Sequence, residues 1–181
     1  MGLRLWAPLV MVLAMPAAAQ TSGYSGQESR EIKALSVEET ADLFAGRGMG
    51  AARAAELNHY PGPAHVLELR EQLGLSAEQI HAVQEIFDRM SGAAKPLGAE
   101  IVAAEKHLDE AFGSGVIAAD TVRGDTAAIA DLQGKLRAVH LTAHLETRAV
   151  LRPEQIARYD ILRGYAAGGT PPAHDHRRHS G

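Results

Sequence analysis

Apolar residues recur along the middle of the chain at alternating steps of three and four positions. From Ser76 onward the series comprises Ile80, Val83, Phe87, Met90, Ala94, Leu97, Ile101, Ala104 and Leu108. This heptad spacing places the apolar side chains on one helix face, which needs a partner helix packed along its length. The pattern predicts a long helix from Ser76 to Gly113. Pro96 lies inside it, between Gly92 and Gly98, and predicts a bend or a short break.

A second series follows a short link that contains two glycines. It comprises Ile129, Leu132, Leu136, Val139 and Ala143, and predicts a helix over residues 119–150. Two such seams joined by a short link are typical of an antiparallel helical hairpin. The aromatic content of 4% also favours helices, because sheets are usually richer in aromatic and β-branched residues. We therefore predict an all-α fold, in which short helices flank a long bent hairpin.

Shorter helices are predicted on both sides of the hairpin. Ser36 and Glu39 form a capping box that begins a helix ending at Phe44. A second short helix is expected over residues 51–57. A third is expected from His65, after the turn at residues 61–63, and is supported by the apolar series Val66, Leu69 and Leu73. The last helix is expected from Pro153 to about Tyr165.

Two of the predicted helix starts carry the same signal. Residues 75–80 read L-S-A-E-Q-I and residues 151–156 read L-R-P-E-Q-I. In the first copy Ser76 fits an N-cap, and Gln79 can bond back to its backbone N–H. In the second copy Arg152 replaces the capping hydroxyl, while the following proline suits the first helical position. The positions that define the motif are Leu75, Ser76, Gln79, Leu151 and Gln155.

This repeated signal resembles the repeated L-T-x-x-Q motif of the Spy/CpxP proteins, which are periplasmic helical chaperones and stress or metal-response proteins. The threonine of that motif is Ser76 in one copy and Arg152 in the other. The resemblance extends from about Tyr60 through Tyr165. It implies an all-helical, cradle-shaped homodimer that acts as an ATP-independent chaperone. Such a protein binds unfolded or partly folded envelope proteins on its concave face and limits their aggregation.

The beginning of the chain has the pattern of a secretory signal peptide. Arg4 precedes an apolar run over residues 5–15, and a cleavage site of small residues ends at Ala19. The run is shorter than the roughly 20 residues needed to cross a bilayer, so cleavage is favoured over a retained anchor. We expect a periplasmic protein with no membrane insertion after cleavage. Its expected parts are a signal peptide (1–19), a flexible segment (20–34), a helical domain (35–165) and a disordered His-containing tail (166–181).

Composition narrows the range of functions. The formal net charge of −4 argues against a general nucleic-acid-binding protein. The chain has no cysteine, which excludes disulfides and thiolate metal sites. None of the common catalytic or nucleotide-binding motifs occurs in it, so we do not expect an enzyme.

Histidines are the candidate metal ligands. His140 and His144 are four positions apart on a predicted helix and therefore share a face. His107, on the partner helix, is the candidate third ligand. The alternative is that these are ordinary residues beside the apolar seam. The tail holds a looser cluster that either binds zinc, copper or nickel or is simply solvated, namely His174, His176 and His179.

Three functions remain open. The first is the periplasmic chaperone, with unfolded proteins as clients and Phe44, Met49 and Met90 as candidate apolar contacts, although Met90 also fits the hairpin core. The second is a periplasmic heavy-metal-binding sensor or resistance protein that uses the histidines. The third is an envelope-stress regulator that docks on a sensor kinase.

Overall fold

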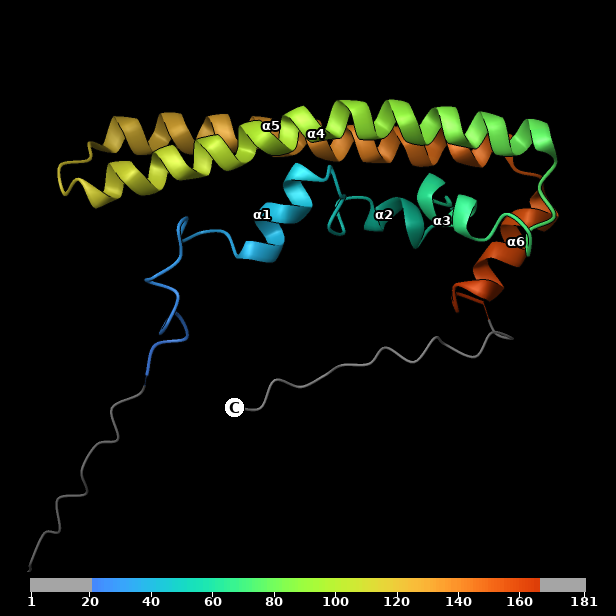
Figure 1. Ribbon diagram of the computed structural model, residues 1–181, viewed down its shortest axis with the longest axis horizontal. Helices are drawn as coiled ribbons and strands as arrows, with labels where there is room; N and C mark the ends of the chain where they lie inside the picture. Colours follow the sequence, from blue (N-terminus) through green and yellow to red (C-terminus); the bar gives the residue numbers. More distant parts are fainter. Residues whose placement is uncertain (1–20, 167–181) are drawn as a thin grey trace, which may run out of the picture.

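The computed structural model describes residues 21–166, which fold into six α-helices. Two long helices, α4 (Ala77–Gly113) and α5 (Ala119–Val150), lie antiparallel and span the length of the molecule (Figure 1). Along one side of this pair lie α1 (Val37–Phe44), α2 (Arg53–Glu56) and α3 (Pro63–Glu68). The last helix, α6 (Pro153–Leu162), lies at the end where α4 begins. The described residues thus confirm the predicted all-α hairpin with flanking short helices.

The two apolar seams form the contact between the long helices. Their buried members are Val83, Ala94 and Ile101 on α4 and Ile129, Leu136 and Ala143 on α5. The helix bounds predicted for α5 and for the start of α4 agree with the structure. The short helices α2 and α6 are shorter than expected, and α3 begins two residues earlier, with Pro63 at its first position.

Pro96 does not interrupt α4, which is continuous from Ala77 to Gly113 and curves along its length in Figure 1. The expected bend is therefore present and the expected short break is not. Proline removes the hydrogen bond to the carbonyl four residues earlier, here that of Gly92. Pro96 and Gly92 both face solvent, so the unpaired carbonyl can be hydrated while the helix continues.

Helix α1 packs directly on the backbone of α4 at Gly98. A Cβ atom at this position would overlap the carbonyl oxygen of Leu43, so only glycine permits the approach. Leu43 then joins a buried cluster with Ile101 and Leu136. The N-terminus of α1 is fixed by Ser36 and Glu39, whose reciprocal hydrogen bonds confirm the predicted capping box.

The packed region begins before residue 35, which corrects the predicted boundary of the flexible segment. Ile32 is buried in the same cluster as Leu43, and Leu35 packs against it. Ion pairs from Lys33 to Asp109 and from Glu31 to Lys106 join this stretch to α4. A single apolar residue between charged neighbours gave too weak a pattern to predict this contact. The predicted signal peptide, its cleavage site near Ala19 and the histidines of the tail lie outside the described residues.

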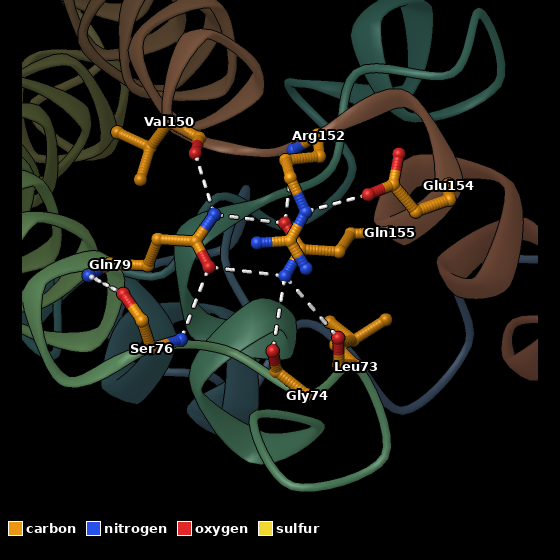
Figure 2. Close-up of polar contacts among 8 residues, drawn as sticks. All are labelled: Leu73, Gly74, Ser76, Gln79, Val150, Arg152, Glu154 and Gln155. Carbon is orange, nitrogen blue, oxygen red and sulfur yellow. Dashed lines mark hydrogen bonds and ion pairs between the residues drawn. The ribbon is translucent and has the colours of Figure 1, made fainter.

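The two copies of the repeated motif meet at the end of the hairpin (Figure 2). Gln79 Nε2 donates to Gln155 Oε1 at 2.8 Å, and Gln155 Nε2 donates to Gln79 Oε1 at 3.0 Å. Each amide oxygen also accepts the backbone N–H of its own helix cap, at Ser76 or Arg152. Each amide nitrogen also donates to carbonyl oxygens of neighbouring turns, which are those of Val150, Leu73 and Gly74.

This amide pair explains why glutamine recurs in the motif. Glutamine offers both a donor and an acceptor, and here both are fully used in a site where Gln155 is only 2% exposed. Leu151 is buried in an apolar cluster beside the pair, and Leu75 packs against that cluster. The shared chemistry of the two helix starts is therefore used for structure, because it closes the open end of the hairpin.

Candidate functional site

The segment over residues 45–62, here called the strap, connects α1 to α3 and contains α2. It crosses a stripe of α5 formed by His140, His144 and Arg148, which are spaced four residues apart. Beneath and beside the strap lies a groove of about 910 Å³, here called the strap groove. Its walls come from the strap, α3, α4, α5 and the residues directly after α6, Arg163 and Tyr165.

His140 lies directly under the strap. A Cβ atom at Gly48 would come within 3.1 Å of His140 Nδ1, so the strap passes the imidazole at backbone distance. The side chain is buried, and its Nε2 atom has no hydrogen-bond partner. Burial, with the neighbouring His144, lowers the pKa of His140 below its usual value. The imidazole is therefore neutral near pH 7, and the ring carries a lone pair available to a ligand.

His144 lies one turn further along α5 and is held by the same strap. Its Nδ1 is 2.7 Å from the carbonyl oxygen of Tyr60. Because a carbonyl can only accept, Nδ1 carries the proton in this hydrogen bond, and Nε2 holds the lone pair when the ring is neutral. A Cβ atom at Gly62 would lie 2.9 Å from His144 Cε1. This bond to a carbonyl fixes the tautomer and the ring orientation, as partners of metal-binding histidines commonly do.

Glu56, on α2, is the centre of a partly buried polar cluster next to His144. The hydroxyls of Tyr159 and Tyr165 donate to Glu56 Oε1 at 2.6 and 3.1 Å. Arg163 Nε lies 3.4 Å from the same oxygen, and His144 Nδ1 lies 3.7 Å from Oε2. Burial and the Glu56 carboxylate together raise the pKa of Tyr159 far above its usual value, so its hydroxyl remains a donor. These contacts tie α2 to the C-terminal end of the fold.

His107 does not join the other two histidines, which corrects its assignment as a third ligand. Its Nε2 is 3.8 Å from Asp125 on the opposite helix. Asp125 precedes His140 on α5 by about 22 Å along the axis, at 1.5 Å per residue. The antiparallel register of the hairpin therefore separates them. Within residues 21–166 no group of three or more His, Asp or Glu side chains is arranged to hold a metal ion.

The remaining histidines of residues 21–166 have other roles. His59, in the strap, pairs with Asp160 at 2.8 Å, and His65 pairs with Glu68 at 3.1 Å. His81 lies on the exposed face of α4, 3.5 Å from Glu85. His140 and His144 are both buried, at 5% and 8% exposed, so they lie inside the packed region and not at the exposed edge of the seam.

Several residues of this site were not predicted from the sequence. Glu56 and Arg163 gave no signal because their partners are distant in sequence. The sequence also does not show the role of Gly48 and Gly62 in the strap, which is to make room for the two imidazoles. The spacing of His140, His144 and Arg148 along one face of α5 was the available clue.

One family model covers most of the chain. The family model described as heavy-metal resistance matches residues 40–158, from within α1 to within α6. This span includes the strap, both buried histidines and both glutamines of the amide pair. No curated protein and no solved structure matches the chain. Among residues 21–166, no helix has both the length and the apolar character needed to cross a membrane.

Proposed function

Since the chain belongs to the heavy-metal resistance family, a Spy/CpxP-like family with a helical fold, we propose that it binds a heavy-metal ion in the strap groove. His140 and His144 supply the nitrogen ligands. The protein then acts in the cell envelope as a metal-binding resistance or sensor protein, with the strap as the part of the fold that responds to occupancy.

The observation that carries this proposal is the pair of buried imidazoles under the strap. His140 Nε2 is buried without a hydrogen-bond partner, which is costly unless a ligand can use it. His144 has its Nδ1 proton committed to the Tyr60 carbonyl, so its Nε2 is free to coordinate. Two imidazoles one helical turn apart are a common half-site for a transition metal.

The donor set fits an ion that accepts two imidazole ligands from α5. Glu56 is close to His144; its Oε1 already receives two tyrosine hydroxyls and lies beside Arg163, while its Oε2 is buried without a hydrogen-bond partner. A further ligand can therefore come from Glu56 Oε2, from other residues of the groove or from solvent. Metal binding would link α5 to the strap through side chains that already touch both.

Metal titration of paired histidine variants tests the proposal. The full chain is compared with H140Q/H144Q and with the tail variant H174Q/H176Q/H179Q. Each protein is titrated with Zn(II), Ni(II) and Cu(I), and calorimetry measures its affinity for each ion. We expect the groove variant to lose at least about 10-fold in affinity for one of these ions, because both first ligands are gone. We expect the tail variant to retain tight binding.

Circular dichroism of each variant shows whether the fold is intact. Equal affinity of the groove variant and the parent for every ion would overturn the proposal. Loss of all tight binding in the tail variant alone would do so as well, because it would place the site outside the groove.

Chaperone activity is the second candidate, favoured by the exposed apolar side chains on and beside the strap. Phe44, Met49 and Leu57 are each about half exposed, and Arg47 and Arg53 lie among them. Such a mixed surface suits weak binding of unfolded chains, since charge speeds the encounter and apolar contact retains the client. Light scattering of a denatured client, with zinc or with chelator, tests it. Suppression of aggregation under both conditions supports a metal-independent chaperone, and none under either argues against it.

The expected homodimer and the sensor-kinase partner stay predictions.

A further inference from the structure

Both methionines that follow the predicted signal peptide line the strap groove. The chain has five methionines, of which three lie within its first 15 residues. The other two, Met49 and Met90, are far apart in sequence and come from the strap and from α4. Both face the same groove as His140 and His144. The same groove is therefore lined by two thioethers and two imidazoles.

Met49 is held at some conformational cost. Its φ of 43° lies in the left-handed region, which is unfavourable for a residue other than glycine. It directly follows Gly48, whose backbone passes the His140 ring. The side chain is 47% exposed, so packing in a core does not explain its position. Strained residues of this kind cluster at functional sites, where the backbone is fixed to present a side chain.

Of the two oxygens of Glu56 in the groove, Oε1 contacts two tyrosine hydroxyls and Arg163, and Oε2 is buried without a hydrogen-bond partner. No group of three His, Asp or Glu side chains in residues 21–166 could complete a site for a divalent ion. Zn(II) usually takes four ligands in tetrahedral geometry, drawn from cysteine, histidine and carboxylate. A soft ion such as Cu(I) is selected instead by sulfur ligands, with imidazole as a suitable companion.

The charges around the groove point the same way. Its lining includes Arg47, Arg53, Lys95 and Arg163 but only two carboxylates, Glu56 and Glu68. An excess of positive charge disfavours a divalent cation more than a monovalent one. Imidazole and thioether are neutral ligands, so they would not compensate the charge of a bound ion. Repulsion from the surrounding cations would therefore cost less for an ion with one positive charge than for an ion with two.

From these observations we propose that the strap groove is selective for a soft monovalent cation, Cu(I), with Ag(I) as its redox-inert equivalent. His140 and His144 bind the ion from α5, and the thioethers of Met49 and Met90 complete the site from the strap and from α4. This inference rests on the proposed function and adds the class of ion.

The test uses the full chain with the three tail histidines replaced by glutamine, so that metal binding reports on the groove. Ag(I) affinity is measured directly, and Cu(I) affinity by anaerobic competition with a chelator. M49L/M90L removes both sulfurs while nearly preserving volume. The control L145M adds a thioether at an exposed position of α5. Zn(II) affinity is measured for each variant.

We expect M49L/M90L to lower Ag(I) and Cu(I) affinity by at least about 10-fold while Zn(II) affinity is unchanged, because only soft ions depend on sulfur. L145M should bind as its parent does. In protein labelled with ¹³C at the methionine methyl groups, Ag(I) should shift the Met49 and Met90 signals, which a purely structural role for these residues would not produce.

Two results would overturn the inference: unchanged Ag(I) affinity in M49L/M90L without methyl shifts, or tighter binding of Zn(II) than of Ag(I) by the parent. Both are separate from the proposed function, which fails if H140Q/H144Q leaves the binding of every ion unchanged or if replacing the tail histidines alone abolishes tight binding. A soft-ion site fails and a metal-binding groove survives if histidine, but not methionine, replacement abolishes binding.

Discussion

Replacing Gln155 by glutamate tests whether the amide pair holds the open end of the hairpin. The change keeps size and shape but removes the side-chain donor. In the native fold Gln155 Nε2 faces three oxygen acceptors, those of Leu73, Gly74 and Gln79, at 3.4, 3.2 and 3.0 Å. A carboxylate at this position presents a negative oxygen to all three, in a site that is 2% exposed.

The expected loss follows from these contacts. A buried polar group left without its partner costs about 1–3 kcal/mol, and a buried charge without a counterion costs about 3–5 kcal/mol. The carboxylate still accepts the Arg152 N–H and the Gln79 amide, which offsets part of the cost. We therefore expect Q155E to lower the free energy of unfolding by about 4 kcal/mol, a large share of the usual total of about 5–15 kcal/mol.

Urea denaturation followed by circular dichroism measures this loss. The matched control is Q133E, the same change at an exposed position of α5, for which we expect less than about 0.5 kcal/mol. Burial should also raise the pKa of the carboxyl introduced by Q155E above its unfolded value. The folded state then binds more protons, so the deficit is present near pH 7 and shrinks as the pH falls through that raised pKa.

A Q155E variant that loses less than about 1 kcal/mol, or that shows the same deficit at every pH, would refute the reasoning. The first result would mean that the amide pair is open to water in solution. The second would mean that the deficit comes from altered packing and does not come from a buried charge.

Three further predictions concern the fold. G98A should lower the free energy of unfolding by about 3 kcal/mol, because its Cβ overlaps the Leu43 carbonyl oxygen and α1 must move; hydrogen exchange should then show earliest opening in α1. Hydrogen bonds from Ser36, first of all from its backbone N–H and then from its hydroxyl, lower the pKa of Glu39 below its ordinary value of 4.5. Its stabilisation of α1 is therefore present above 4.5 and is lost as pH falls through the folded value. S36A keeps the backbone N–H, so NMR titration of this variant should show only a partial return of the pKa towards normal. L136D should cost about 4 kcal/mol by burying an unpaired charge in the hairpin seam, and an unchanged thermal midpoint would contradict that placement.

The hairpin could be predicted because its information is local and periodic. The steps of three and four in α4 and α5 fix which face of each helix is buried, whatever lies between them. The helix caps could be predicted for the same reason, since Ser36 and Ser76 form hydrogen bonds with residues only three positions ahead. Pairing of the two motif copies was not predicted, because no local pattern shows that Gln79 and Gln155 exchange hydrogen bonds.

The groove could not be predicted, because it depends on residues brought together by the strap. A hydropathy pattern treats the glycines of residues 46–62 only as helix breakers. Their function becomes visible when the imidazoles of α5 are seen against the backbone of Gly48 and Gly62. The error over His107 has the same origin. The spacing of residues on one helix shows which of them share a face, but it does not show which residue of the other helix lies opposite them. The sequence therefore correctly predicted that His140 and His144 share a face of α5, and it placed His107 with them although the register keeps it apart.

The residues of the repeated motif and the residues proposed to bind metal have different roles and lie in different parts of the fold. Gln79 and Gln155 use every donor and acceptor of their amides within the fold, so they have nothing left for a ligand. His140 keeps a buried nitrogen unpaired, which the fold itself does not need. In this chain the motif therefore specifies the scaffold alone. The ion that this protein binds should follow from the side chains that line the strap groove, which include two histidines and two methionines.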